Sequence, residues 1–261
     1  MRSESVGNRL LADLPAADRN RVLAVGKRVA LTYGDVLQEP GEPIRFVYFP
    51  VSGMISLLIP VEDRGNLEVG LLGIEGFLGV PAVLGVRIAA LQGLVQGSGV
   101  ALRLRVPTFR RVLESSAALR RTMSRYAYVM LAQLAGSAGC VRFHLLEARL
   151  ARWLLMTHDR ADSNEFHLTH EFLAQMLGVR RVGVTNAAGV LQRRNLIAYA
   201  RGEITVLDRA GLEAASCSCY QKGQAVYESS FKSPARSLSV RRSAPEHTDR
   251  LKGHRRLPDE V

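Results

Sequence analysis

The sequence contains few cysteines and no long apolar run. Its 261 residues include only three cysteines, Cys140, Cys217 and Cys219, a sparse and odd number that does not suit a disulfide framework and is typical of a reducing compartment. No apolar run approaches the roughly 20 residues that a membrane-spanning helix needs, and the first residues, MRSESVGNRLLADLP, lack the apolar stretch of a signal peptide. We therefore expect a cytoplasmic protein with no membrane partner.

Acidic residues and catalytic motifs are also scarce. The 35 lysines and arginines outnumber the 24 aspartates and glutamates, which gives a net charge of +11. This balance favours a polyanionic partner, although a generally basic protein would show it as well. The sequence has no Ser/His/Asp set, phosphate-binding loop or paired acids, so we do not expect an enzyme. Cys217 and Cys219 have no nearby histidine or further cysteine in the sequence and make an incomplete zinc set. The prediction is free thiols and no metal site.

Two long segments differ in their patterns. Between residues 29 and 104, short runs of valine, isoleucine, leucine, phenylalanine and tyrosine alternate with glycine and proline, which indicates an antiparallel sandwich or barrel. From residue 106 to 138 turn signals become rare, which predicts one long helix. Its apolar residues recur at steps of three or four: Leu119, Met123, Tyr126, Met130 and Leu134. Because this helix is apolar on more than one side, we expect it to pack on the sheet and against a second chain. Burial within a single subunit is the alternative.

Residues 168–207 have the pattern of two helices, a tight turn and a β-hairpin. Thr169 can serve as N-cap of the first helix, which ends at Gly178 because glycine adopts the left-handed conformation without a side-chain clash. The second helix spans about residues 180–194 and buries an apolar stripe made of Val184, Ala187, Ala188 and Leu191. Residues 196–207 predict a hairpin, or wing, with a basic tip.

The opposite face of the second helix suits the major groove of DNA, where a helix-turn-helix inserts its second helix. Arginine can pair with guanine, asparagine with adenine, and the apolar atoms of valine and threonine can meet a thymine methyl. The predicted base-reading residues are Arg181, Val182, Thr185 and Asn186. The residues expected on phosphates, where contacts position the protein, are Thr169, His170, Arg180, Arg193, Arg194 and Arg201.

Several segments resemble the Crp/Fnr family of transcription regulators, over about residues 8–215. LLADLP, YGDVLQEPGEP, VYFPVSGMISLL and VGLLGIEGFLGVPAVLG are similar to its cyclic-nucleotide-binding-type β-roll, and HLTHEFLAQMLGVRRVGVTNAAGVLQRRNLIAYARGEITVLD to its winged helix-turn-helix. The resemblance implies a homodimer paired along the long helix, with two recognition helices on a palindromic site of double-stranded DNA. Residues 159–165 occupy the position where some family members contact RNA polymerase; a polar surface loop without this role is the alternative.

The sequence departs from this family in two respects. Members that bind cyclic AMP carry a Gly-Glu segment followed by an Arg-Ser or Arg-Thr pair. Here Gly73, Glu75 and Gly76 fit in part, but Arg87 is followed by Ile88, so the hydroxyl for the phosphate is missing. These four positions, Gly73, Glu75, Gly76 and Arg87, mark the candidate effector pocket. No cysteine precedes Cys140, which argues against an iron–sulfur cluster. We predict no cofactor, neither a cyclic nucleotide nor a cluster, and the effector is unknown.

The recognition helix departs as well, because Val182 and Asn186 stand where the family commonly has glutamate and arginine. The operator sequence should therefore differ from the best-known one. The expected fold is α+β, with an antiparallel, jelly-roll-like β-roll (residues 1–105), a long dimerisation helix (106–138), a winged helix-turn-helix (139–215) and a basic, disordered tail (216–261). The expected function is sequence-specific transcription regulation. The alternative is a small-molecule-binding module whose winged helix contacts protein instead of an operator.

Overall fold

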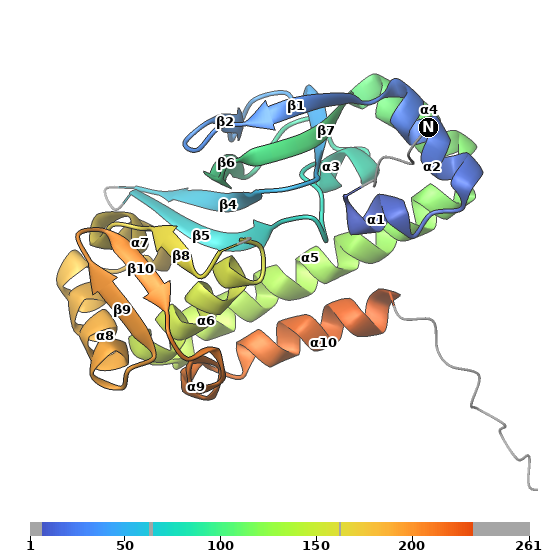
Figure 1. Cartoon of the computed structure of the whole chain (residues 1–261). Helices are drawn as coiled ribbons and strands as arrows, with labels where there is room; N and C mark the ends of the chain where they lie inside the picture. The colour runs from blue at the N-terminus through green and yellow to red at the C-terminus, as the bar shows by residue number, and fades with distance from the viewer. Residues whose placement is uncertain (1–6, 63–64, 162, 232–261) are drawn as a thin grey trace, which may run out of the picture. The chain divides into compact units, whose positions relative to one another are not determined.

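The computed structural model describes residues 7–62, 65–161 and 163–231. Antiparallel sheets come first, a long helix follows, and the C-terminal part is mainly helical (Figure 1). The elements of the first part are α1 (Arg9–Ala12), α2 (Ala16–Val25), β1 (Lys27–Leu31), β2 (Val36–Gln38), β3 (Phe46–Pro50), β4 (Met54–Val61), β5 (Gly65–Leu72), α3 (Val80–Val83), β6 (Gln92–Gly97), β7 (Gly99–Arg105) and α4 (Val106–Ser115). The elements of the second part are α5 (Ala117–Phe143), α6 (Leu146–His158), β8 (Glu165–His167), α7 (His170–Leu177), α8 (Arg181–Arg193), β9 (Ile197–Ala200), β10 (Glu203–Val206), α9 (Arg209–Ala215) and α10 (Cys219–Phe231).

The N-terminal strands form two antiparallel sheets, in the orders β1-β7-β3 and β2-β6-β4-β5. Residues of both sheets enter one apolar core, since alternate side chains of a strand point to the same face. Phe49 of β3 stacks on Phe77, with ring centroids 5.1 Å apart, and Phe109 of α4 packs on both rings. The predicted antiparallel β-roll is therefore present.

The predicted single helix of residues 106–138 is interrupted at Ser116. Its backbone is extended (φ −128°, ψ 104°), and its hydroxyl oxygen accepts a hydrogen bond from the Leu119 N–H at 3.0 Å. The serine starts a new helix, because its side chain accepts a hydrogen bond from a first-turn N–H that has no backbone partner. Its extended backbone ends the preceding helix. The second piece, α5, then continues past residue 138 and ends with His144 as its C-cap.

The apolar stripe predicted for the dimer faces the core of its own chain. Leu119, Met123, Tyr126 and Met130 are all buried in the β-roll core, and Leu134 is partly buried against it. The prediction is corrected on this point: the periodicity identified a buried face, and the covering partner is the β-roll. The exposed large residues of α5 lie on another face and include Tyr128 and Leu131, which are 60% and 65% exposed.

A tight contact joins the β-roll to α5 at Gly76. A Cβ atom added to this glycine would lie 2.1 Å from the Tyr126 hydroxyl oxygen, closer than atoms can approach. The Tyr126 ring packs on Phe77 at a centroid distance of 5.3 Å. Gly76 is thus required by the space that Tyr126 occupies and not by its backbone angles.

The C-terminal part is a winged helix-turn-helix with three strands instead of two. β10 pairs with β9, as the predicted hairpin requires, and also with β8, which the sequence pattern did not indicate. β8 is only three residues long, too short to show an alternation. Helices α6, α7 and α8 enclose a second apolar core around Trp153, Leu173 and Leu191. The α+β fold class is confirmed.

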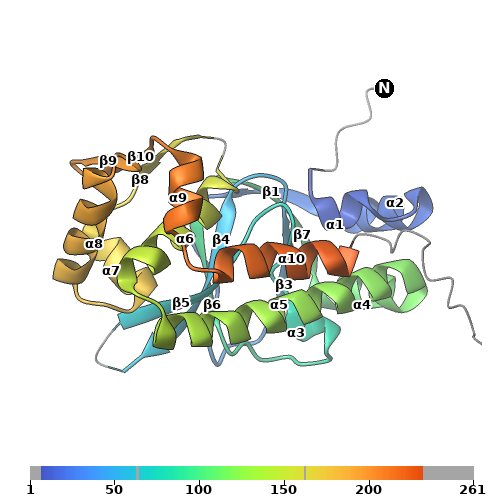
Figure 2. The same cartoon turned by 90° about the horizontal axis from the view of Figure 1, so that it is seen from below.

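The predicted disordered tail is corrected for its first residues, because Cys219–Phe231 form the helix α10. This helix lies beside α5 in both views (Figures 1 and 2). Tyr220 is buried in the C-terminal core, and Tyr227 and Phe231 pack on the β-roll core. Residues 220, 227 and 231 share one helical face, a signal that the polar composition of the segment concealed. Residues 232–261 lie outside the described ranges.

Candidate functional site

The turn between α7 and α8 is built as the local sequence predicts. The Thr169 hydroxyl oxygen accepts a hydrogen bond from the Phe172 N–H at 3.1 Å and so caps α7. Gly178 ends α7 in the left-handed conformation, with φ 64° and ψ 43°. α8 starts three residues later and buries Val184, Ala187, Ala188 and Leu191 against the C-terminal core. The buried stripe fixes the orientation of α8 and turns its opposite face to solvent.

The exposed face of α8 carries all four predicted base-reading residues. Arg181, Val182, Thr185 and Asn186 are exposed, and Val182 is 63% exposed. They occupy the first two turns of the helix, the part that enters the major groove in a helix-turn-helix. The exposed Val182 side chain leaves apolar surface in contact with water in the free protein, which is unfavourable. A thymine methyl can cover this surface.

Basic residues flank this face. Arg180 is the N-cap residue of α8 and is exposed; its guanidinium, which only donates, cannot cap the helix. Arg193 and Arg194 end the helix and are exposed. Arg201 lies at the tip of the wing, where its positive φ of 51° closes the turn between β9 and β10. Exposed arginines thus lie at both ends of α8 and at the tip of the wing, in positions suited to phosphate contacts.

Two of the predicted contacts have partners within the domain. The His170 ring stacks on Tyr199 with centroids 4.2 Å apart, and its Nδ1 lies 3.0 Å from the Thr185 hydroxyl oxygen. Burial and the positive charge of Arg181 lower the pKa of His170, which favours the neutral ring. His170 thus also contacts Thr185, a predicted base-reading residue, and its phosphate contact stays a prediction. The sequence pattern could not show this contact across the turn.

The predicted effector residues Glu75 and Arg87 lie in different surroundings. Both guanidinium contacts of Glu75 come from Arg160 of the C-terminal part, with Nη2 at 2.7 Å and Nε at 2.9 Å from Oε1. The Gly73 N–H donates to the same oxygen at 3.1 Å. Arg87 is exposed on the segment after α3. The Glu75 carboxylate is thus paired with Arg160 of the same chain, and the effector pocket stays a prediction.

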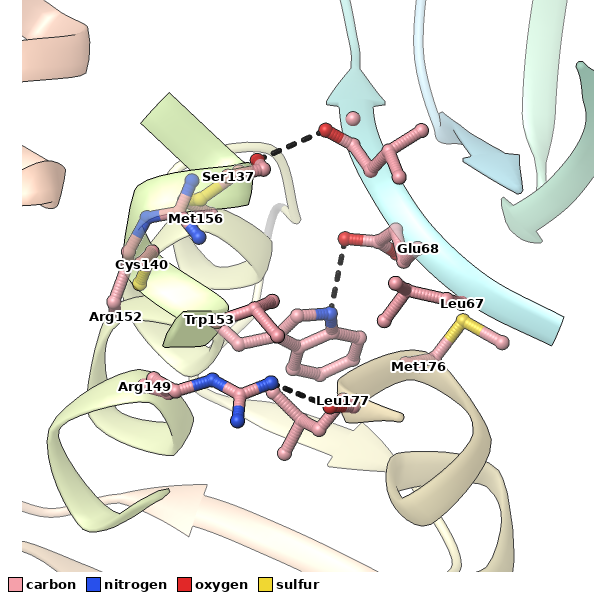
Figure 3. Close-up of a pocket in the computed structure, with 13 residues that line it drawn as sticks. Leu67, Glu68, Ser137, Cys140, Arg149, Arg152, Trp153, Met156, Met176 and Leu177 are labelled. Atoms are coloured by element: carbon pink, nitrogen blue, oxygen red, sulfur yellow. Dashed lines mark hydrogen bonds between the residues drawn. The ribbon is translucent and has the colours of Figure 1, made fainter. Parts of the chain in front are cut away.

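A second contact between the two cores surrounds Glu68 of β5. The Trp153 indole N–H of α6 donates to Glu68 Oε1 at 3.0 Å, and the Ser56 hydroxyl donates to Oε2 at 2.8 Å. The cavity beside it, of about 30 Å³, is lined by Leu67, Arg149, Arg152 and Met176 among others (Figure 3). This volume accommodates one or two water molecules and not a nucleotide.

Glu68 makes the stability of the protein pH-dependent. Burial raises its pKa from 4.5 to about 7, although the Ser56 hydrogen bond and the charges of Arg152 and Arg160 lower it. The pKa of Glu68 is higher in the folded than in the unfolded protein. The favourable contribution of the neutral Glu68 carboxyl to the free energy of unfolding is therefore complete below about pH 4.5 and is lost as the pH rises through about 7. We expect Glu68→Gln to increase the free energy of unfolding by about 1–3 kcal/mol at pH 8 and to change it little at pH 4.5. Urea unfolding at both pH values measures this.

The control for this prediction is Glu62→Gln, at an exposed glutamate of the same hairpin. It should change the free energy of unfolding by less than about 0.5 kcal/mol at either pH. A Glu68→Gln variant that is less stable than the parent at pH 8 would contradict the prediction.

An antiparallel β-roll followed by a long helix and a winged helix-turn-helix defines a class of DNA-binding transcription regulators. Residues 148–215 match the family model of the Crp-like helix-turn-helix domain. This part of the chain is therefore a Crp-like helix-turn-helix domain, and the described chain as a whole has the fold of Crp/Fnr transcription regulators. The resemblance stated from the sequence is confirmed.

The solved structures agree over most of both chains. A Crp/Fnr-family regulator from Eubacterium rectale superposes with a TM-score of 0.64 at 19% identity, over 80% of this chain and 98% of the other. FixK2 from Bradyrhizobium japonicum gives 0.63 at 14% identity, over 74% and 98%. TTHA1359 from Thermus thermophilus gives 0.62 at 23% identity, over 73% and 98%. No curated protein sequence matches the chain.

No helix in the described ranges is long and apolar enough to cross a membrane.

Proposed function

We propose that the chain is a sequence-specific transcription regulator that binds a palindromic operator as a homodimer, with the β-roll as its regulatory part. The observation that carries this proposal is the exposed face of α8, where Arg181, Val182 and Asn186 lie open to solvent. Further exposed arginines lie at both ends of the helix and at the wing tip. Bidentate hydrogen bonds to guanine and adenine need these side-chain types. We therefore expect each operator half-site to contain a guanine read by Arg181, a thymine contacted by Val182 and an adenine read by Asn186.

A seam along α5 supports the homodimer. Tyr128 and Leu131 are exposed, and Ala135 and Ala138 continue the same stripe at steps of four and three, all exposed. A repeat of three and four residues is the pattern of two helices that pack side by side. Pairing along α5 would place the two recognition helices on successive major grooves, about 34 Å apart.

The contacts between the two cores give the β-roll a means of regulation. Glu75 and Glu68 of the β-roll bind Arg160 and Trp153 of the DNA-binding part. A ligand can shift the balance between two arrangements of the β-roll and the DNA-binding part only if it binds one of them more tightly than the other. We assign the loop of residues 159–165 to contact with RNA polymerase; Asp159, Ser163, Asn164 and Glu165 are exposed in it.

The function is tested by replacing Arg181. The operator is first obtained by selecting bound sequences from random double-stranded DNA, and affinities are then measured by gel shift at one stated salt concentration. We expect Arg181→Ala to lose about 1–3 kcal/mol on the operator and to relax the preference at one base pair, because a bidentate contact discriminates by that amount. Arg194→Ala, the control at a phosphate position, should weaken selected and random DNA equally.

One outcome would refute the function, and a second would refute the role of Arg181. If selection returns no consensus, the alternative of a small-molecule-binding module with a protein-binding winged helix is favoured. If Arg181→Ala weakens selected and random DNA by the same factor, Arg181 does not read a base.

A further inference from the structure

Four metal-ligating side chains meet where the long helix ends. Cys140 lies in the last turn of α5, and His144 is the C-cap residue one turn further. Cys217 and Cys219 lie 73 or more residues later in the sequence, at the start of α10. The ligand atoms of all four side chains lie within 4.8 Å of one another. The pair Cys217 and Cys219 therefore gains the histidine and the third cysteine that it lacks in the sequence.

The spacing of these atoms fits one tetrahedral ion. The Cys140 and Cys217 sulfurs are 3.5 Å apart, and the Cys219 sulfur is 3.5 Å from Nδ1 of His144. Zinc–sulfur bonds of about 2.3 Å place neighbouring tetrahedral ligands roughly 3.8 Å apart. A disulfide would require about 2.05 Å between sulfurs, and a cluster of several iron atoms would need its ligands further apart. We propose that Cys140, His144, Cys217 and Cys219 together bind a single Zn²⁺ ion.

The charges around the four residues suit this ion. Three thiolates and a neutral histidine around Zn²⁺ carry a net charge of −1. Arg149 is buried nearby, and Arg152 acts electrostatically on all three cysteines. The Nε of Arg152 is buried and has no hydrogen-bond partner in the described structure. Figure 3 shows Arg152 and Cys140 on the same side of the small cavity. An arginine with an unused donor beside the thiols compensates an anionic centre.

The site would be structural, because four protein ligands leave no position for a substrate. It joins the end of α5 to the beginning of α10. The Cys217 N–H already donates to the Ala148 C=O of α6 at 3.3 Å, which holds the second ligand segment near the first. The ion would thus fix the winged helix-turn-helix and α10 to the end of the long helix. Metal binding to folded residues contributes directly to folding stability.

The test uses the purified full chain from cells grown with added zinc. We expect about one zinc per chain by elemental analysis. After removal of the zinc with a chelator, titration with Co²⁺ should give the visible bands of a tetrahedral ion and a sulfur-to-metal charge-transfer band. Cys219→Ser and His144→Ala should each weaken Zn²⁺ binding by more than the roughly 10–100-fold that loss of an outer-shell partner costs.

His167→Gln is the matched control, because His167 lies exposed on β8 outside the four-residue group. It should retain one zinc per chain. The Co²⁺ spectrum of the unmodified chain tests the proposal even if a variant does not fold. Metal-free protein whose Co²⁺ spectrum lacks the charge-transfer band overturns the proposal. So does a Cys140–Cys217 disulfide found by peptide mapping in the protein as purified, before any metal is removed, because oxidised sulfurs cannot serve as thiolate ligands.

Discussion

Leu131→Asp should convert the protein to a monomer and reduce its affinity for the operator by about 10²–10⁴-fold. Leu131 is 65% exposed at the centre of the α5 seam, where an identical residue of a second chain would cover it. A buried aspartate there would be unpaired in both chains and would oppose its like charge. Monomers lose the affinity that two linked half-sites provide, which is commonly a factor of this size. Sedimentation velocity and gel shift measure the two effects.

Leu84→Asp is the matched control, since Leu84 is 66% exposed but follows α3 in the β-roll. It should leave both the sedimentation coefficient and the operator affinity unchanged. A Leu131→Asp variant that sediments as a dimer would show that α5 is not the seam.

Arg160→Met should lower the free energy of unfolding by about 2–3 kcal/mol, somewhat less than a fully buried pair would lose. The Arg160 and Glu75 side chains are only 14% and 16% exposed. Methionine leaves the Glu75 carboxylate without its countercharge in a poorly solvated position. For a chain of this length we expect the melting temperature to fall by about 5–10 °C, measurable by calorimetry.

The comparison pair is Arg21 and Asp18, whose side chains are 54% and 19% exposed. Arg21→Met should cost less than about 1 kcal/mol, as exposed ion pairs contribute little. The double variant Glu75→Gln with Arg160→Met should recover part of the loss, because no buried charge remains unpaired. Equal losses of unfolding free energy in Arg160→Met and Arg21→Met would refute the interpretation that burial makes the Arg160–Glu75 pair the more important of the two.

The sequence predicted those features whose causes are local. Thr169 and Gly178 set the ends of α7 through interactions within a few residues, and the period of the apolar residues oriented α8. The β-roll was predictable from short apolar runs between turn residues. Each of these signals depends on residues within one or two consecutive helices or strands, and a sequence pattern can be recognised over that range.

Features that depend on distant segments were not predictable. The stripe of Leu119, Met123 and Met130 revealed a buried face of α5, but periodicity cannot tell whether a sheet or a second chain covers it. The Cys217–Cys219 pair looked incomplete because its two other ligands come from another helix. Glu75 looked like a ligand-binding residue because Arg160 lies 85 positions away. In all three cases the missing information was the packing of one part on another.

The close contact of Gly76 with Tyr126 has an evolutionary consequence. A Cβ at position 76 would collide with the tyrosine hydroxyl and lie only 2.7 Å from its Cζ, so removal of the hydroxyl alone does not create enough room. Homologous proteins with a side chain at position 76 should therefore carry a residue smaller than an aromatic one at position 126. Those with tyrosine at 126 should keep glycine at 76. The two positions should covary across the family, although 50 residues separate them in the sequence.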